Sequence, residues 1–516
     1  MNQGSSKRSD RLVASDTRRQ QLHDLVDRIA DFSEFFDGSF LAFEKKLRKH
    51  VWVLARLLIG LFLLARHHRI HEKHNDYAGH RKMPGLFRRT LRTMYGKVRY
   101  KRDYWVKRQG GGGFHPLDAE LGLTRDGFSP WVISLACRLA TYLSYARSTL
   151  VMDAFWGWSP STETVEQWVL GLARDGSAYM TSSPPFPETD GAVLVIEVDG
   201  KAVPTARADE LAKRRGPRPH KEEGECDCQR HRGQAERRRS RKLRKSSKKR
   251  RKKGDKSKNG RSATLVAMYT LRPGKDGKLH GPINKRVWGS FASRKEMLQW
   301  ARAEATRRGF GPSTNQLVQI VVDGDPCLAK RLRRLFRKAT ITLDIRHVEE
   351  RLWQTGHVFH KEGSPELQAW VEELRAILYK QSGRALVTRL EKLRQQIACR
   401  GPGTKDKRAA LDKLITYLKP RTKMMRYAKN IERDMVIASG VIEGAVRYVI
   451  GERMDCSGMR WIEEKAEAIL HLRCIEVNGL WDHFFEWSQD RRQQRLNNKE
   501  NVQIRTDKGL ELEQAA

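Results

Sequence analysis

Two aspartates of the chain have the types and positions that metal-dependent chemistry at phosphorus requires. Asp199 and Asp323 each end an apolar run typical of a buried strand, and a glycine follows each of them. If the two strands are neighbours, the carboxylates converge at the carboxyl end of a sheet, where ligands bind in α/β folds. Such carboxylates repel each other unless a cation lies between them, and Mg²⁺ or Mn²⁺ suits oxygen ligands of this kind.

A third acid can come from a helix that packs over the sheet. The segment ASGVIEGAVRYVIGERM predicts this helix, with Ser439 as its N-cap and Glu443 in its first turn. Its predicted buried stripe consists of Ile442, Ala445, Val446 and Val449. Together with Asp199 and Asp323, Glu443 could hold two metal ions, which would activate an attacking oxygen and stabilise the leaving oxygen at phosphorus.

Each acid also has an ordinary structural interpretation. An aspartate at a strand end is commonly a turn former or a helix cap. Asp325 or Asp344 could replace Asp323 as the second ligand, and Glu197 shares a strand face with Asp199. Glu443 could simply pair with Arg447, one helical turn further on. The weight of the hypothesis therefore rests on the set of three acids, not on any one of them.

The elements that must position these acids follow an α/β pattern. Strands are predicted over residues 192–200, 264–271, 284–291, 315–323 and 339–344, with helices over 293–308 and 326–336. The segment from Arg346 to about Tyr427 is wholly helical in its periodicity, which predicts a helical insertion before the helix of Glu443.

The chain divides into six predicted regions. They are an N-terminal helical region (1–89), a hairpin and helix-turn-helix region for DNA binding (90–182), the first part of the α/β core (186–349), a helical insertion (350–428), the catalytic-helix part of the core (429–487) and a polar tail (488–516). In the second region, two helices flank Trp156-Gly157, and Ser159 is expected to cap the second helix, whose apolar stripe is Val165, Trp168, Val169 and Leu172.

The charge of the chain indicates a polyanionic partner. Lys and Arg number 101 against 61 acids, a formal net charge of +40, which favours nucleic acid. Sixteen of the 25 residues from Arg237 to Arg261 are basic, within a predicted arm at 215–262. That density predicts a DNA-backbone contact through Arg237, Arg238, Arg239, Lys248, Lys249, Arg250, Arg251, Lys252 and Lys253.

Other features point to a cytoplasmic protein without a membrane span. The N-terminus is polar, and the apolar stretch from Val51 to Ala65 is interrupted by Arg56. The seven cysteines are scattered, which favours reduced thiols. Cys226, Cys228 and His231 form a small cluster that lacks a fourth ligand and the usual spacing for zinc, so a basic loop is the stronger interpretation.

Several strings of the sequence resemble the DDE transposases of bacterial insertion sequences. They are VIEVDGK, VVDGDPCLAKRL, LDIRHVEERLW, and SGVIEGAVRYVIGERM with CSGMRW. The resemblance is to the Kra-type family and, more distantly, to Mutator-like transposases, and it extends from about Thr90 to Phe485. It implies an α/β ribonuclease-H-like catalytic core with a helical insertion, and a mainly α N-terminal DNA-binding region.

The resemblance also assigns roles to individual residues. The family's catalytic and metal-binding acids fall on Asp199, Asp323 and Glu443, and its Asp-x-x-His motif falls on Asp344 and His347. His347 would contact the scissile strand or brace the site. Arg453, Arg460 and Trp461 match the segment after the glutamate, as DNA contacts or as core packing. The cysteine pairs that relatives carry near the hairpin are missing from WVKRQGGGGFHP, which argues against zinc there.

The activity that the resemblance implies is cleavage of transposon ends and strand transfer into target DNA, with two Mg²⁺ or Mn²⁺ ions. Both ends must be handled together, so a homodimer or larger assembly on DNA is expected, in the bacterial cytoplasm at the nucleoid. Two alternatives stay open: a nuclease that does not join DNA, and an inactive DNA-binding descendant of a mobile element. The three acids are all present, which argues against the second.

Overall fold

The structure is a computed structural model that describes residues 3–73, 76–206, 260–311, 313–456 and 459–500 of the 516-residue chain. The chain forms two compact units, Met1–Asp175 with Gly479–Ala516, and Gly176–Asn478. The first unit is mainly helical and carries small sheets, whereas the second is built on one five-stranded mixed sheet. Among the described residues, no helix is both long and apolar enough to cross a membrane.

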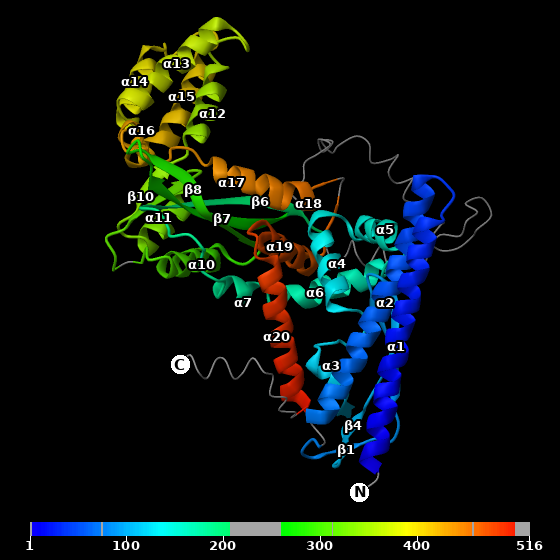
Figure 1. Cartoon of the computed structure of the whole chain (residues 1–516). Helices are drawn as coiled ribbons and strands as arrows, with labels where there is room; N and C mark the ends of the chain where they lie inside the picture. The colour runs from blue at the N-terminus through cyan, green and yellow to red at the C-terminus, as the bar shows by residue number, and fades with distance from the viewer. Residues whose placement is uncertain (1–2, 74–75, 207–259, 312, 457–458, 501–516) are drawn as a thin grey trace, which may run out of the picture. The chain divides into compact units, whose positions relative to one another are not determined.

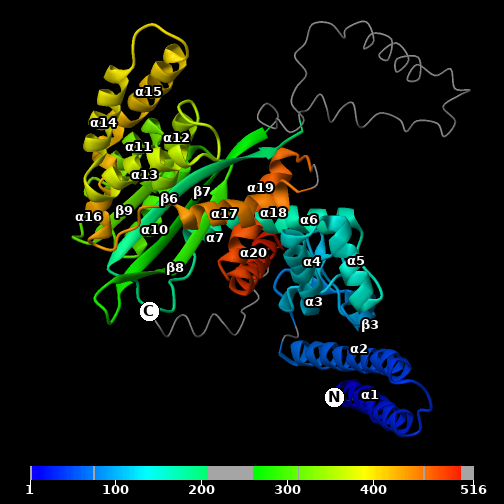
Figure 2. The same cartoon turned by 90° about the horizontal axis from the view of Figure 1, so that it is seen from above.

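The first unit contains two long N-terminal helices that pack side by side (Figures 1 and 2). Its helices are α1 (Gln3–Glu34), α2 (Phe40–Lys73), α3 (Pro116–Glu120), α4 (Pro130–Tyr142), α5 (Tyr145–Trp156), α6 (Thr162–Ala173) and α20 (Trp481–Glu500). Its strands are β1 (His80–Lys82), β2 (Phe87–Thr93), β3 (Gly96–Arg102), β4 (Trp105–Lys107) and β5 (Gly113–Phe114). Strands β2 and β3 form a two-stranded hairpin, and β1, β4 and β5 form a second sheet.

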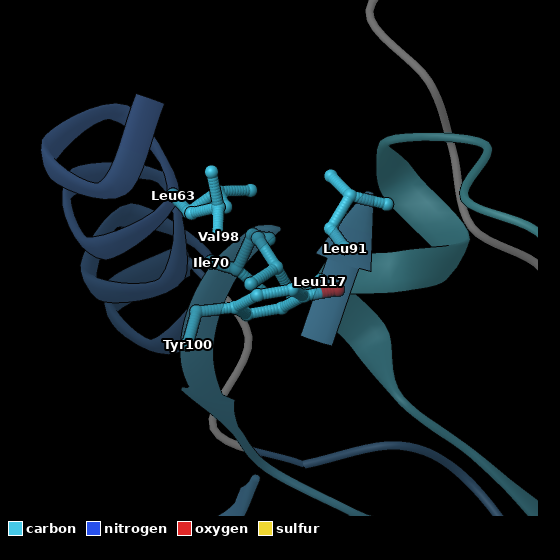
Figure 3. Close-up of a cluster of buried hydrophobic side chains, with 6 residues drawn as sticks. All are labelled: Leu63, Ile70, Leu91, Val98, Tyr100 and Leu117. Atoms are coloured by element: carbon cyan, nitrogen blue, oxygen red, sulfur yellow. The ribbon is translucent and has the colours of Figure 1, made fainter. Parts of the chain in front are cut away.

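A buried apolar cluster fixes the hairpin onto α2 and α3. Its members alternate along each strand and recur at helical spacing along α2, so that they meet in one layer (Figure 3). They are Leu63 and Ile70 of α2, Leu91 of β2, Val98 and Tyr100 of β3, and Leu117 of α3. Burial of these six side chains leaves the opposite face of the hairpin to solvent.

The predicted helix pair around Trp156-Gly157 is present as α5 and α6. Gly157 ends α5 in the left-handed conformation (φ 71°), and the predicted stripe of α6 is buried. The predicted cap of α6 was wrong by two residues, because Ser161 and not Ser159 accepts the hydrogen bond from Thr164 N. The helix begins at Thr162, so Ser161 and not Ser159 is next to the free amides of the first turn.

The C-terminal helix α20 belongs to the first unit, which differs from the predicted division at residue 487. Trp481 and Phe484 are buried, and the indole Nε1 of Trp481 donates to Ser134 Oγ of α4 at 2.9 Å. Residues 481–500 therefore form a helix whose first turn contacts α4, where the sequence had suggested the end of the core and a polar tail. The other boundary lies at residue 175 and not at 182.

The sheet of the second unit has the strand order β10-β9-β6-β7-β8. Its strands are β6 (Val193–Pro204), β7 (Gly260–Pro273), β8 (Leu279–Ser290), β9 (Leu317–Val322) and β10 (Thr340–Leu343). The three consecutive strands β6, β7 and β8 are antiparallel neighbours, whereas β9 and β10 join the other edge of β6 in parallel. All five strands lie in or next to the segments that the apolar runs predicted.

Helices cover both faces of this sheet and extend beyond its β10 edge (Figures 1 and 2). They are α7 (Gly176–Thr181), α10 (Arg294–Arg307), α11 (Pro326–Leu335), α12 (Ile345–Gly356), α13 (Pro365–Lys380), α14 (Gly383–Gln396), α15 (Thr404–Leu418), the 3-10 helix η1 (Lys419–Met424), α16 (Tyr427–Ile431), α17 (Gly440–Ala445), the π-helix η2 (Val446–Gly451), α18 (Glu452–Met454) and α19 (Glu463–Val477). Ser293 is the N-cap of α10 and forms a capping box with Glu296.

Helices α12 to α16 form the predicted helical insertion between β10 and α17 (Figures 1 and 2). The chain leaves the sheet at Ile345 and returns at Ile437, and Ile345 N donates to Ile437 O at 3.0 Å. The two ends of the insertion are therefore adjacent. After the return, Met435, Val436 and Val441 pack on buried side chains of β6, β7 and β9, which places α17 over that face of the sheet.

Candidate functional site

Three aspartates form a row at the position where the parallel pairing of β6, β9 and β10 ends. Val198 of β6 is in register with Val322 of β9, and Val322 is in register with Leu343 of β10. The next residue of each strand is an aspartate: Asp199, Asp323 and Asp344. Residues that share a register position point to the same face of a sheet. The structure thus brings the two predicted aspartates into neighbouring positions and adds Asp344 to the row.

Asp199 is half-buried and its surroundings oppose its charge. The prediction that it ends its strand was wrong, because β6 continues to Pro204 in pairing with β7. Burial raises the pKa of this carboxyl above its ordinary value, and the negative charge of Asp323 raises it further. Gly200 N, which donates to Asp199 Oδ1 at 2.6 Å, and the nearby charges of His347 and Arg294 act in the opposite direction. Asp199 and Asp323 therefore form a mutually repulsive pair, as the sequence predicted.

Asp323 is exposed, and contacts from the helical insertion hold its backbone. The hydroxyl of Tyr417 donates to Asp323 O at 3.1 Å, and Arg421 Nε donates to Gly324 O at 2.9 Å. The guanidinium of Arg421 also lies 4.2 Å from the centre of the Tyr417 ring. Gly324 has a φ of 93°, a conformation that favours glycine. Tyr417 and Arg421 lie in α15 and η1, far from Asp323 in the sequence, and no local pattern predicts these contacts.

Glu443 lies in α17, on the same side of the sheet, but its predicted surroundings differ in detail. Ser439 is the N-cap residue of α17, as predicted, but its side chain makes no capping hydrogen bond. Its hydroxyl donates to Asp344 Oδ2 and lies 3.4 Å from Glu443 Oε1. The hydroxyl is engaged with the buried carboxylate of Asp344, which explains why Ser439 makes no capping bond to the first turn of α17. The ion pair of Glu443 is with Arg346 at 3.5 Å, and not with the predicted alternative, Arg447.

Glu197 connects the sheet to the helix of Glu443. Its side chain is fully buried, and it accepts hydrogen bonds from the Tyr269 hydroxyl and from Ile442 N, both at 2.7 Å. Burial raises the pKa of Glu197 to about 7, because it outweighs these two hydrogen bonds and is reinforced by the charges of Asp344 and Glu443. Glu197 is therefore an anchor for α17 beneath the row, rather than an exposed ligand.

His347 stands in the first turn of α12, next to the row. Its Nε2 lies 3.9 Å from Asp344 Oδ2, and its Nδ1 lies 3.7 Å from Glu350 Oε2. It is also close enough to Asp199 to lower the pKa of that carboxyl. Asp344 caps α12 by accepting from Arg346 N at 2.9 Å. The Asp-x-x-His motif is thus a helix start that presents a half-exposed histidine to the row.

Asp325, one of the alternatives to Asp323, has a structural role. It caps α11 by accepting from Cys327 N at 2.8 Å, and its other oxygen binds Arg294. Arg294 also influences the pKa of Asp199, so it is a cation at the border of the row that the sequence did not reveal. Arg294 is the first residue of α10, and a basic residue at a helix start does not by itself predict a functional site.

The donor set at the row fits a divalent cation in part. Asp199 and Asp323 supply hard oxygen ligands from a pair whose mutual repulsion a cation would relieve. Within the described ranges, no three His, Cys, Asp or Glu side chains are gathered closely enough to form a ready-made metal site. Glu443 is the third carboxylate of this neighbourhood, and here it pairs with Arg346.

The remaining predicted contacts divide into two groups. Arg453 and Trp461 are buried, and the Arg453 guanidinium lies 4.9 Å from the centre of the Trp461 ring. Arg460 Nη2 donates to Thr205 O at 3.2 Å. These contacts favour the packing interpretation for Arg453 and Trp461, and DNA contact by the three residues stays a prediction.

The predicted basic arm residues, Arg237 to Lys253, and the cluster of Cys226, Cys228 and His231 lie outside the described residues.

Comparison with known proteins does not assign the chain to a family. No protein-family model matches it, and no curated protein sequence matches it at a significant level. The row of aspartates and the elements around it are therefore the features of the chain that indicate its function.

Proposed function

We propose that the chain is a DDE transposase that cleaves transposon ends and joins them to target DNA, with Asp199, Asp323 and Glu443 as its catalytic acids. The observation that carries the proposal is the register of β6 and β9, which puts Asp199 beside Asp323. The helix that carries Glu443 packs over the same face and is attached to β6 through Glu197. Adjacent acids from two strands and one covering helix are what such chemistry needs.

The strand order supports the same proposal. Three antiparallel strands followed by two parallel strands on the other edge of the first strand are the arrangement expected of a ribonuclease-H-like core. The helical insertion before α17 agrees with the organisation that the sequence resemblance implies. The excess of positive charge supports a DNA substrate.

Mg²⁺ or Mn²⁺ would be held by Asp199 and Asp323, with Glu443 as the third acid. When bound, it would activate the attacking oxygen and stabilise the leaving oxygen at phosphorus. The chain's own residues provide the rest: Arg294 and His347 balance the charge of Asp199, and the Tyr417 and Arg421 contacts fix the backbone of Asp323. Joining requires two DNA ends at once, so a dimer or larger assembly on DNA belongs to the proposal.

The test compares the full-length wild type with Asp199→Asn, Asp323→Asn and Glu443→Gln. The substrate is linear DNA that carries the ends of the source element, incubated with Mg²⁺ or Mn²⁺ and a supercoiled target plasmid. Glu373→Gln is the matched control, because Glu373 is an exposed acid of the insertion that pairs with Arg389. We expect wild type and Glu373→Gln to cut and join, and the three site variants to bind the ends and do neither.

Other outcomes separate the alternatives. Cleavage without joined product would indicate a nuclease. Binding by all five proteins without any reaction would indicate a DNA-binding descendant of a mobile element. If Glu443→Gln reacts as wild type does, Glu443 is not the third acid.

A further inference from the structure

The β2–β3 hairpin of the first unit carries five cations on one face. Side chains at alternate positions of a strand share a face, and every member of this set is exposed. The set, named here the outer face, is Arg88, Thr90 and Arg92 of β2 with Lys97, Arg99 and Lys101 of β3. Five of these six residues are basic, and the hairpin has only its own two strands in its sheet.

The inner face of the hairpin is different, because its cations are neutralised. Arg89 Nη1 lies 2.5 Å from Asp118 Oδ2, and Arg102 also pairs with Asp118. The Tyr100 hydroxyl donates to the same carboxylate at 2.7 Å. Between these polar contacts the inner face is apolar and packs on α2 and α3 (Figure 3). The cations of the inner face are therefore paired with an acid, in contrast to those of the outer face.

On the outer face, like charges stand directly opposite each other. Arg88 is in register with Lys101, and Arg92 is in register with Lys97. Such pairs destabilise an antiparallel sheet, by amounts comparable with the roughly 0.2–1 kcal/mol of a favourable cross-strand pair. Within the described part of the chain, Arg88, Lys97, Arg99 and Lys101 have no acidic partner. In solvent alone, the repulsion between these like charges has no stabilising counterpart, whereas a bound polyanion would neutralise the charges and relieve the repulsion.

A hollow beside the hairpin is lined in part by the same cations, next to apolar side chains and Asp103. It has a volume of about 1270 Å³, and its lining includes Arg88, Arg99 and Lys101 together with Arg18 of α1. Gly60 of α2 makes room for Arg18, because a Cβ at this position would lie 2.6 Å from Arg18 Nη1. The cations thus belong to a surface shared by α1, α2 and the hairpin, all within one unit.

We infer that the outer face of the β2–β3 hairpin binds the phosphate backbone of double-stranded DNA, with the two-stranded ribbon in the major groove. The inference rests on the proposed function, in that DNA is the polyanion. The major groove of B-form DNA is about 12 Å wide and admits a two-stranded ribbon, whereas that of A-form RNA is too narrow. The turn at Tyr95 is held by Arg56 of α2, whose Nη1 donates to Tyr95 O at 2.8 Å, so the ribbon is presented rigidly.

The test measures binding of full-length protein to a fluorescent mixed-sequence DNA duplex, without divalent metal and at several salt concentrations. The variant is Arg88→Gln/Arg99→Gln/Lys101→Gln. Each phosphate contact that is lost should lower the slope of log affinity against log salt by about 0.9, so a decrease of about 2–3 is expected. The matched control is Arg375→Gln/Arg389→Gln/Arg394→Gln, which removes the same charge from ion-paired side chains of α13 and α14.

An unchanged slope in the hairpin variant, or an equal decrease in the control, would overturn the inference. An RNA duplex of the same sequence should show a smaller loss in the hairpin variant, and an equal loss would exclude the B-form groove. Lys101→Glu, opposite Arg88, should weaken DNA binding while its melting temperature stays equal to or above that of wild type. A lower melting temperature would instead assign these cations to folding.

This experiment is independent of catalysis. A chain that loses DNA binding in the hairpin variant but never cuts DNA would refute only the proposed enzyme. A chain that cuts and joins DNA while the hairpin variant binds normally would refute only the role of the hairpin.

Discussion

Glu197 of the first core strand accepts a hydrogen bond from Ile442 N, at 2.7 Å, and so attaches the helix of Glu443 to the sheet. The other oxygen of the same carboxylate accepts from the Tyr269 hydroxyl. Both donors are buried with it, so neither has water as a substitute. The position of Glu443 over the row of aspartates therefore depends on a residue that need not touch a substrate.

Glu197→Gln should destabilise the second unit. The amide nitrogen of glutamine cannot accept a hydrogen bond, so Ile442 N or the Tyr269 hydroxyl loses its acceptor, at a cost of about 1–3 kcal/mol. Urea denaturation measures the effect. Tyr269→Phe, which removes one donor, serves as the partner in a double-mutant cycle, and strict additivity of the two substitutions would show that the pair does not interact.

Gly324→Ala should destabilise the loop that follows Asp323. The φ of 93° is unfavourable for alanine, and an added Cβ would lie 2.5 Å from Tyr417 Oη and 2.8 Å from Leu343 Cδ1. We expect a loss of about 1–3 kcal/mol in thermal or urea unfolding. Gly444→Ala is the matched control, because a Cβ there meets nothing within 4 Å and should leave stability equal or slightly higher. Equal stability of the two variants would contradict the close approach.

His347→Gln should reduce cleavage of transposon ends without weakening DNA binding. The histidine borders Asp344 and Asp199 and lies at the start of α12. Residues that support a metal site in this way typically contribute about 10–100-fold to activity. Cleavage kinetics under single-turnover conditions, next to a binding curve, measure the two effects separately. A variant that cuts at the wild-type rate would remove His347 from the site.

The first unit should lose stability in acid through Asp103. Burial by itself would raise the pKa of this carboxyl, but the adjacent His67 and Lys82 outweigh it and lower the pKa from 3.8 to about 2. A depressed pKa stabilises the folded state above the unfolded value, and the contribution, about 2 kcal/mol, is lost as the pH falls from about 4 to 2.

Asp103→Asn isolates this contribution. Its stability should fall below that of wild type at neutral pH, and the difference should shrink as the pH is lowered below 4. Denaturation followed at several pH values measures the difference. A gap between wild type and variant that stays constant down to pH 2 would show that Asp103 is not the titrating group.

Much of the core could be predicted from local pattern. The apolar runs before Asp199 and Asp323 have the length and composition of buried strands. The Asp-Gly pair marks the strand end only for β9, because β6 continues past Gly200 to Pro204. The helix predicted over residues 293–308 is present as α10, with Ser293 as its N-cap. These features depend on residues close in the sequence, so the sequence carries them.

The contacts that complete the site could not be predicted in the same way. Tyr417 and Arg421 reach a loop 94 and 97 residues earlier in the chain, and no periodicity encodes such a meeting. Ser439 is the N-cap residue of α17, but a buried aspartate 95 residues away takes its hydroxyl. Glu197 was a possible metal ligand by its position on the strand, and only the packing of α17 shows that it holds this helix on the sheet.

The hydrogen bond between Ile345 and Ile437 means that the chain enters and leaves the helical insertion at adjacent points on the sheet. Such a module can lengthen, shorten or be replaced during evolution while the sheet beneath it keeps its register. The Tyr417 and Arg421 contacts with the loop of Asp323 limit such changes in the size of the insertion, because they hold the backbone next to a proposed catalytic acid. Descendants of this chain that change the size of the module should therefore conserve these two side chains, or an equivalent pair, more strictly than the helices that carry them.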